Sequence, residues 1–174
     1  MIRKTCFAVL AAVVLAVPTA QAQEMFLDQV DGPCTNDGAQ WIGGFVGAFL
    51  EDGFGQATLR TCGQSGPPIL QLICPHRGTK ITVSLTLPSR NVSPRLPMAV
   101  DIGTADQRFR FAGFGQTDGN WPRMEFEVDR NGAFIAALTS STAVSFDVGR
   151  FSTTLGLAGS SRALDAMERA CIPN

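Results

Sequence analysis

Residues 80–87 read Lys-Ile-Thr-Val-Ser-Leu-Thr-Leu, and this stretch indicates the fold class most directly. Apolar and polar residues alternate strictly along it, so four aliphatic side chains share one face: Ile81, Val83, Leu85 and Leu87. Such alternation is typical of a half-buried strand, and β-branched threonines suit its outer side. Pro88 then ends the segment. The stretch therefore predicts a strand in a sheet that covers a core with one face.

Two more alternating segments lie farther along the chain, at residues 107–111 and 123–129, with the turn-rich residues 115–120 between them. Folded as a hairpin, they form four cross-strand pairs: Arg110 with Glu125, Arg108 with Glu127, Phe109 with Phe126, and Phe111 with Met124. Such pairs stabilise a sheet by roughly 0.2–1 kcal/mol each. We therefore expect these arginines to be structural. The alternative is that they bind an anion or a nucleic-acid backbone.

Turn signals and cap signals outline the other elements. Five further strands are expected at residues 58–62, 69–74 and 98–102, and at 144–148 with 151–155 as a hairpin. Residues 133–138 are expected to form one or two helical turns. Residues 162–171 predict a closing helix whose apolar face carries Leu164, Met167 and Cys171. We expect that face to dock on the sheet.

Residues 39–50 are apolar and rich in glycine. Their large side chains fall at helical spacing, which favours a short N-terminal helix, with a buried strand as the alternative. Gly43 and Gly47 would permit close packing. The segment is shorter than the roughly 20 residues that a membrane helix needs, so we expect no stable membrane insertion.

The start of the chain is typical of an export signal. Arg3 and Lys4 precede an apolar run of residues 6–17, and residues 20–22 read Ala-Gln-Ala. This pattern predicts a signal peptide over residues 1–22, cleaved after Ala22, and a periplasmic or secreted protein. Loss of two basic residues lowers Lys+Arg from 14 to 12 against 15 Asp+Glu, which leaves a net charge of about −3. This balance does not favour a nucleic-acid partner.

Four cysteines remain after cleavage, namely Cys34, Cys62, Cys74 and Cys171. In an exported chain they are expected to form two disulfides, for which three connectivities exist. A hairpin of residues 58–62 and 69–74 sets Cys74 opposite a residue near Thr58, several positions from Cys62. Since a disulfide needs Cα atoms within about 7 Å, we favour Cys34–Cys62 and Cys74–Cys171.

Catalytic and metal-binding patterns are weak. The chain has one His and no Tyr, and its cysteines have no C-x-x-C spacing. A metal site or a thiol nucleophile would have to combine Cys74 with His76, whereas Cys74 is expected to be oxidised. The carboxylate pairs Glu51-Asp52 and Glu125/Glu127 are weak candidates for glycosidase chemistry. We expect no catalytic residue, no metal and no cofactor.

The end of the chain carries a family resemblance. The ordered series is Phe134-Ile135-Ala136-Ala137-Leu138, Val144-Ser145-Phe146, Thr154 to Ser160, and a helix that ends in Cys171. It resembles the end of two groups of small exported proteobacterial β-proteins, the type VI secretion-associated periplasmic accessory family and the invasion-associated locus B family. Leu72-Ile73-Cys74 is similar to a strand of the former. The resemblance implies a compact β-sandwich-like domain without catalytic residues.

These observations together predict a mainly β protein. We expect residues 23–174 to form one antiparallel β-sandwich-like domain with a short N-terminal helix, a C-terminal helix and two disulfides. The expected function is that of a non-enzymatic binding or accessory protein of the cell envelope, linked to a secretion or virulence system and bound to another envelope protein. The alternatives are an inhibitor or immunity protein against an envelope hydrolase, and a small hydrolase.

Overall fold

The computed structural model describes residues 26–35, 38–46, 54–64, 66–75, 78–87, 96–118 and 121–171. The predicted signal peptide lies outside these residues. Within them the elements are β1 (Phe26–Cys34), β2 (Ala39–Val46), β3 (Phe54–Thr61), β4 (Leu70–Pro75), β5 (Lys80–Thr86), β6 (Pro97–Gly103), β7 (Arg108–Asp118), β8 (Trp121–Asp129), α1 (Ala133–Ser140), β9 (Ala143–Val148), β10 (Phe151–Gly156) and α2 (Ser160–Cys171).

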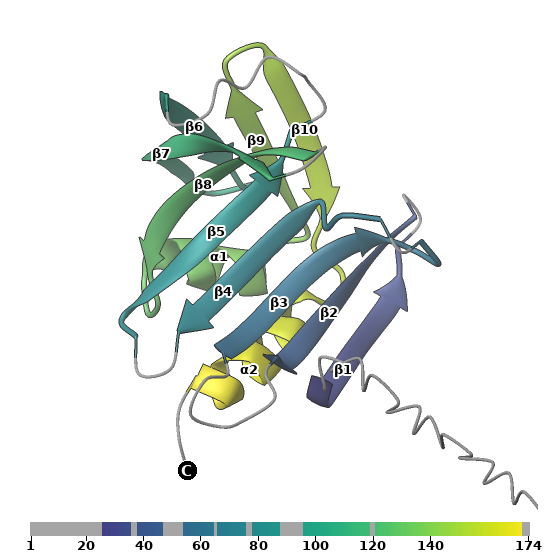
Figure 1. Cartoon of the computed structure of the whole chain (residues 1–174). Coiled ribbons are helices and arrows are strands. Elements are labelled where there is room, and N and C mark those ends of the chain that lie inside the picture. Colours follow the sequence, from purple (N-terminus) through teal and green to yellow (C-terminus); the bar gives the residue numbers. More distant parts are fainter. Residues whose placement is uncertain are drawn as a thin grey trace, which may run out of the picture.

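The strands form one antiparallel sheet in the order β1-β2-β3-β4-β5-β8-β7-β6-β9-β10. This sheet curls into a half-barrel, and both helices lie on its concave side, here called the inner face (Figure 1). The prediction of a mainly antiparallel β protein is confirmed. One curled sheet, rather than the two packed sheets of a clear sandwich, encloses the core.

Strand β5 lies in the middle of the sheet, between β4 and β8. Its four alternating aliphatic side chains all point to the inner face and are almost completely buried: Ile81, Val83, Leu85 and Leu87. The predicted strand is thus confirmed, with its polar residues on the outer face. Aromatic side chains continue the core toward α1, where the ring of Phe134 meets Phe109 at 5.6 Å and Phe111 at 5.4 Å.

The predicted register of the hairpin at residues 107–129 is wrong by four residues. Phe114, not Arg110, lies opposite Glu125, and the described pairing with β8 begins at Gly113. Strand β7 is longer than expected, and Asp118 pairs with Trp121, so only two residues remain for the turn. A short turn sets the register of a hairpin, which explains the shift.

The two predicted arginine–glutamate pairs are therefore absent from the described strands. Arg110 lies opposite Asp101 of β6, with 3.5 Å between Nη1 and Oδ1, and Arg108 lies opposite Gly103. Glu127 faces Thr82 of β5. A shift of four residues is even, so every side chain keeps its predicted face. The arginines are exposed as expected. The predicted pairs of Phe109 with Phe126 and of Phe111 with Met124 are wrong, because Phe126 lies opposite Gly113 and Met124 opposite Gly115. The rings of Phe111 and Phe126 nevertheless stack at 5.1 Å.

The expected N-terminal helix is wrong: residues 39–46 form strand β2, which pairs with β3 over its whole length. Residues 47–50 lie outside the described part of the chain. Trp41 and Gly43 both lie on the inner face, at the two-residue spacing of a strand. Glycines cost a helix about 1 kcal/mol each, whereas here one of them gives α2 room to approach.

Helix α2 rests directly on two inner-face glycines of neighbouring strands. A Cβ atom at Gly43 would overlap the backbone of Ala163, and one at Gly55 would overlap the backbone of Met167. The apolar face predicted for this helix is buried against β2 and β3, with Leu164, Met167 and Cys171 at most 1% exposed. The expectation that Gly43 permits close packing is confirmed.

Both favoured disulfides are present. Cys34–Cys62 joins β1 to the turn after β3, with Cα atoms 6.1 Å apart. Cys74–Cys171 joins β4 to the last turn of α2, with Cα atoms 5.9 Å apart. Cys74 lies opposite Gly55, close to the position expected from the hairpin argument. The second bridge thus ties the helix to the sheet beside one of its two glycine contacts.

The glycine contact predicts a large effect for a small substitution. Gly43→Ala would force α2 away from β2, and overpacking of this kind costs about 1–3 kcal/mol. We expect the melting temperature of the purified chain to fall by roughly 2–12 °C. Gly66→Ala is the matched control, because a Cβ atom there meets nothing within 4 Å. Equal melting temperatures for the two variants would contradict this packing.

The two disulfides are expected to differ in their contribution to stability. They span 28 and 97 residues, for which loop-closure entropy gives about 3–4 and about 4–5 kcal/mol. Denaturant unfolding of the Cys34→Ala/Cys62→Ala and Cys74→Ala/Cys171→Ala variants measures both contributions. The second double variant should be the less stable, and the opposite order would show that α2 is held mainly by packing.

Candidate functional site

The two margins of the curled sheet meet at one end of the half-barrel. The indole Nε1 of Trp41 in β2 donates a hydrogen bond to the carbonyl of Gly156 at the end of β10, at 3.2 Å. Beside it, Gly159 has a positive φ of 89° and packs against Gly32 and Pro33 of β1. A side chain at position 159 would be strained there. These contacts close the half-barrel at this end.

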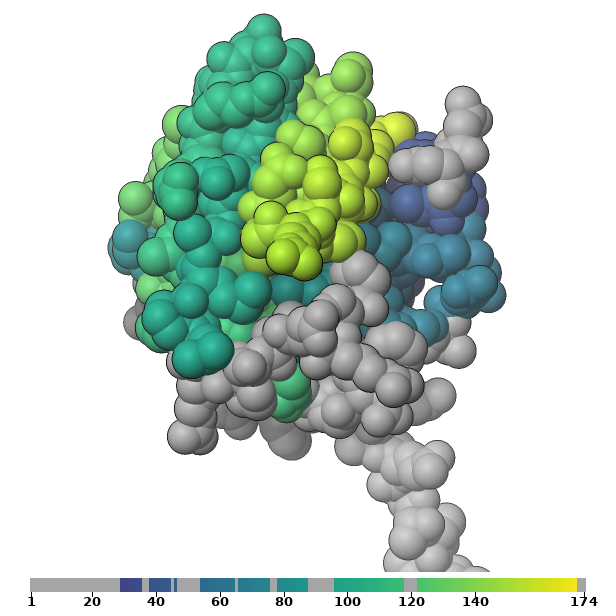
Figure 2. Space-filling model, turned by 90° about the horizontal axis from the view of Figure 1, so that it is seen from above, coloured from purple at the N-terminus to yellow at the C-terminus, as the bar shows by residue number. Residues whose placement is uncertain are grey.

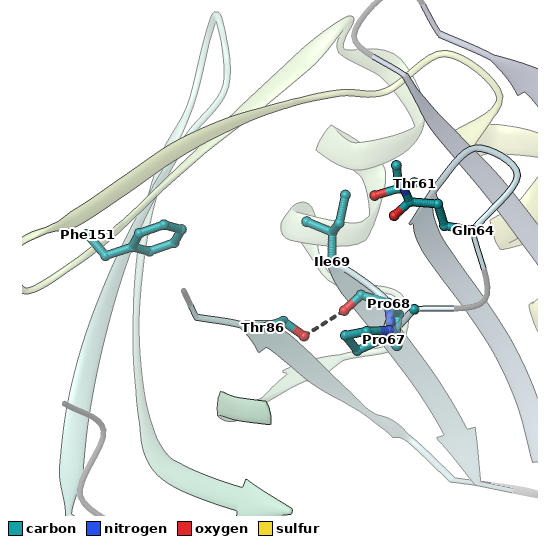
Figure 3. Close-up of a pocket in the computed structure, with 8 residues that line it drawn as sticks. Thr61, Gln64, Pro67, Pro68, Ile69, Thr86 and Phe151 are labelled. Atoms are coloured by element: carbon teal, nitrogen blue, oxygen red, sulfur yellow. Dashed lines mark hydrogen bonds between the residues drawn. The ribbon is translucent and has the colours of Figure 1, made fainter. Parts of the chain in front are cut away.

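The start of β10 lies apart from the β3 to β4 connection, and a hollow of about 400 Å³ opens between them. We call it the mouth pocket; its described lining residues are Thr61, Gln64, Gly66, Pro67, Pro68, Ile69, Thr86 and Phe151. In Figure 3 the ring of Phe151 faces Ile69 and the two prolines across the gap. Figure 2 looks down on this end, with the yellow-green β9 and β10 between teal and blue segments.

The wall opposite Phe151 is held in place by main-chain and side-chain bonds. The hydroxyl of Thr86 donates to the Pro68 carbonyl at 2.6 Å, and its amide donates to the Ile69 carbonyl at 3.0 Å. The Ile69 amide donates to Leu59 at 2.7 Å. At its other end the connection begins at Cys62, which the Cys34 disulfide fixes. Two consecutive prolines restrict it further, so the pocket is formed before any ligand binds.

The chemistry of the mouth pocket is that of a binding site. Apolar side chains dominate it, and Thr61, Gln64 and Thr86 add hydroxyl and amide groups. None of the described lining residues carries a carboxylate, an imidazole, a thiol or an amine. Pockets that combine apolar walls with a few polar groups are typical of ligand recognition. This pocket can hold an uncharged group and offer it hydrogen bonds.

The residues singled out from the sequence lie elsewhere. Cys62 directly precedes the connection that forms one wall of the pocket. None of the site residues predicted from the sequence is among the described lining residues. Arg123 pairs with Glu125 at 2.8 Å on the outer face. Lys80 is the first residue of β5 and Thr86 is the last. Hydrogen bonding and charge attraction from Asp129 raise the pKa of Lys80 above its ordinary value.

Three candidates for chemistry fall outside the described residues: Glu51, Asp52 and His76. Among the residues that the structure describes, no cluster of His, Cys, Asp and Glu could hold a metal ion. Sequence reasoning missed the pocket because residues 63–68 read as an ordinary connection. The available signal was the adjacent pair Pro67-Pro68, five residues after the disulfide cysteine Cys62.

A second surface feature lies where β6 begins beside β7. Leu96 and Phe114 are each 56% exposed, although both are large and apolar. The Leu96 carbonyl accepts a hydrogen bond from Gly115 at 3.2 Å, and Phe114 lies opposite Pro97. Leu96 immediately precedes β6, whereas Phe114 belongs to β7. Exposed apolar surface of this kind can contact another protein.

Comparisons with known proteins add no relative: no protein-family model matches the chain, and neither the curated proteins nor the solved structures contain a match. In the described part of the chain, no helix has the length and apolar character needed to cross a membrane. The proposals below therefore rest on the residues and geometry of this chain.

The Thr86 hydroxyl provides a test of the rigid wall. Thr86→Val removes the hydroxyl that donates to the Pro68 carbonyl. Loss of this hydrogen bond destabilises the wall by about 1 kcal/mol. We expect the Ile69 amide to exchange its hydrogen about fivefold faster, as measured by NMR. Thr86→Ser keeps the hydroxyl and serves as the control. Equal exchange rates in these two variants would show that the bond does not hold the wall.

Proposed function

We propose that this chain is an exported, non-enzymatic binding or accessory protein of the bacterial cell envelope, linked to a secretion or virulence system. The observation that carries the proposal is the mouth pocket, whose described lining is apolar, hydroxyl and amide in character. Such a lining can recognise a ligand but offers no general acid, base or nucleophile. The hydrolase alternative instead needs a polar site that includes His76 with a carboxylate partner.

Export is the second part of the proposal. The two disulfides suit an oxidising compartment, and residues 1–22 have the pattern of a signal peptide. The mature protein would be periplasmic or secreted and would begin at Gln23. Its partner would be another envelope protein, because Leu96 and Phe114 expose apolar surface beyond the mouth pocket.

A photo-crosslinking amino acid at position 64 tests this function. Gln64 is exposed and lines the pocket, so a bound envelope protein would lie within reach of the probe. We expect one dominant protein adduct in intact bacteria, detected by blotting of the periplasmic fraction. The same probe at the exposed Asp165 of α2 is the control, since that position lies on a different element.

Each outcome bears on the proposal. A single adduct from position 64 that is missing from position 165 supports a binding function at the mouth. If the adduct is an envelope hydrolase whose activity falls, the protein is an inhibitor or immunity protein rather than an accessory protein. The absence of any adduct at position 64, or the same adducts from both positions, would contradict a binding site at the mouth.

A further inference from the structure

The two edges of the sheet differ in how they are protected. Strand β1 carries the exposed Asp31 and Pro33, and its pairing with β2 shifts register twice. Charges, prolines and bulges of this kind keep an edge from pairing with another chain. Strand β10 has none of them: its six residues are uncharged and pair with β9 without a shift. Its free edge is therefore open to a further strand.

The hairpin geometry shows which groups are available on that edge. Val148 and Phe151 flank a two-residue turn and form a hydrogen-bonded pair. Because such pairs alternate along an antiparallel ladder, the backbone groups of Ser152 and Thr154 point away from β9. The backbone groups of Gly156 also point away from β9, and its carbonyl accepts the hydrogen bond from Trp41. The next positions toward the mouth, Thr154 and Ser152, have exposed side chains.

We propose that the β10 edge accepts an extended segment of a partner protein whose paired residues are uncharged, and which adds as one more strand and places an apolar side chain in the mouth pocket. Phe151 belongs both to β10 and to the pocket, so one segment can use both. Main-chain bonds to Ser152 and Thr154 would supply affinity, and the pocket would supply specificity. This inference rests on the binding function proposed above and names the kind of partner.

The space beside β10 favours a single segment over a second copy of this chain. An added strand lies about 4.8 Å from the strand that it pairs with. If the β10 of a second copy took this place, its β9 and β6 would also have to fit beside it. The β3 to β4 connection stands opposite Phe151, and the hollow between them is only about 400 Å³ (Figure 3). A volume of this size suits a few side chains, whereas the edge of a whole sheet needs an open flank.

The side chains along the edge restrict the sequence expected for the partner segment. Ser152 and Thr154 would lie beside its residues, and uncharged β-branched residues pair well with threonine across strands. Arg150 is exposed in the turn just before β10. A carboxylate at the corresponding end of the segment would pair with this guanidinium. The expected segment is therefore β-branched and apolar, with an acidic residue at one end.

Proline at position 154 tests the edge directly. Thr154→Pro removes an amide donor that faces away from β9, and an edge strand tolerates proline at such a position. Combined with the probe at position 64, this variant should give about tenfold less adduct than the chain with the probe alone. Thr154→Val keeps the amide, so its adduct yield should stay well above that of Thr154→Pro. Ser152→Pro provides a second variant, and thermal unfolding confirms that each variant is folded.

The outcomes separate this inference from the proposed function. An adduct that both proline variants leave unchanged overturns strand addition while the binding function stands. An adduct formed with a second copy of the chain also overturns it, as would a cross-linked segment that mass spectrometry maps to a helix or to a strand with charges among its paired residues. Loss of every adduct, even without the proline, removes the binding function and this inference with it.

Discussion

The close approach of α2 to the sheet is the constraint on which the rest of this structure depends. Gly43 and Gly55 leave no side chain between the sheet and the backbone of the helix. The helix can therefore fill the concave side of β2 and β3, while the larger side chains of β5 and β8 fill the remainder of the core. Cys74–Cys171 fixes the position of the helix along the strands. Neighbouring strands with bulky residues at these two positions could not hold α2 at this depth.

The packing of α2 on the sheet also determines where the protein can bind a ligand or partner. The chain passes from β10 directly into α2, and Trp41 bonds to the carbonyl of Gly156 just before the helix. The closed end of the half-barrel is thus anchored by the same helix that fills it. The start of β10 lies farther from α2 than its end does (Figure 1), and Phe151 at that start lines the mouth pocket. Binding surface and structural core are consequently separate parts of the molecule.

The sequence was informative wherever one face of a strand is buried. The alternation at residues 80–87, the hairpin around Gly149-Arg150 and the apolar face ending at Cys171 all predicted the observed elements, and the disulfide pairs followed from strand geometry. Errors arose where two patterns compete. Helical spacing of large residues obscured the two-residue spacing of Trp41 and Gly43, whose meaning depends on a helix more than 100 residues away.

The mouth pocket and the hairpin register were harder to predict for different reasons. Charge complementarity predicted a pair of Arg110 with Glu125, but the register is set by a two-residue turn at the end of a longer strand. Arg110 pairs with Asp101 instead, and Glu125 pairs with Arg123. The pocket joins Phe151 to residues more than 60 positions earlier. Only the curl of the sheet brings them together, and curl leaves no local pattern in the sequence.

The position of α2 at the end of the chain has a consequence for biogenesis. Synthesis proceeds from the N-terminus, so β2 and β3 emerge long before the helix that covers them. Until the twelve residues of α2 have been made, their inner face stays exposed and the thiol of Cys74 lacks its native partner. Cys34 and Cys62 are already present during that interval and offer Cys74 two incorrect pairings. Cys74 must therefore be free, or be freed by thiol–disulfide exchange, when Cys171 becomes available.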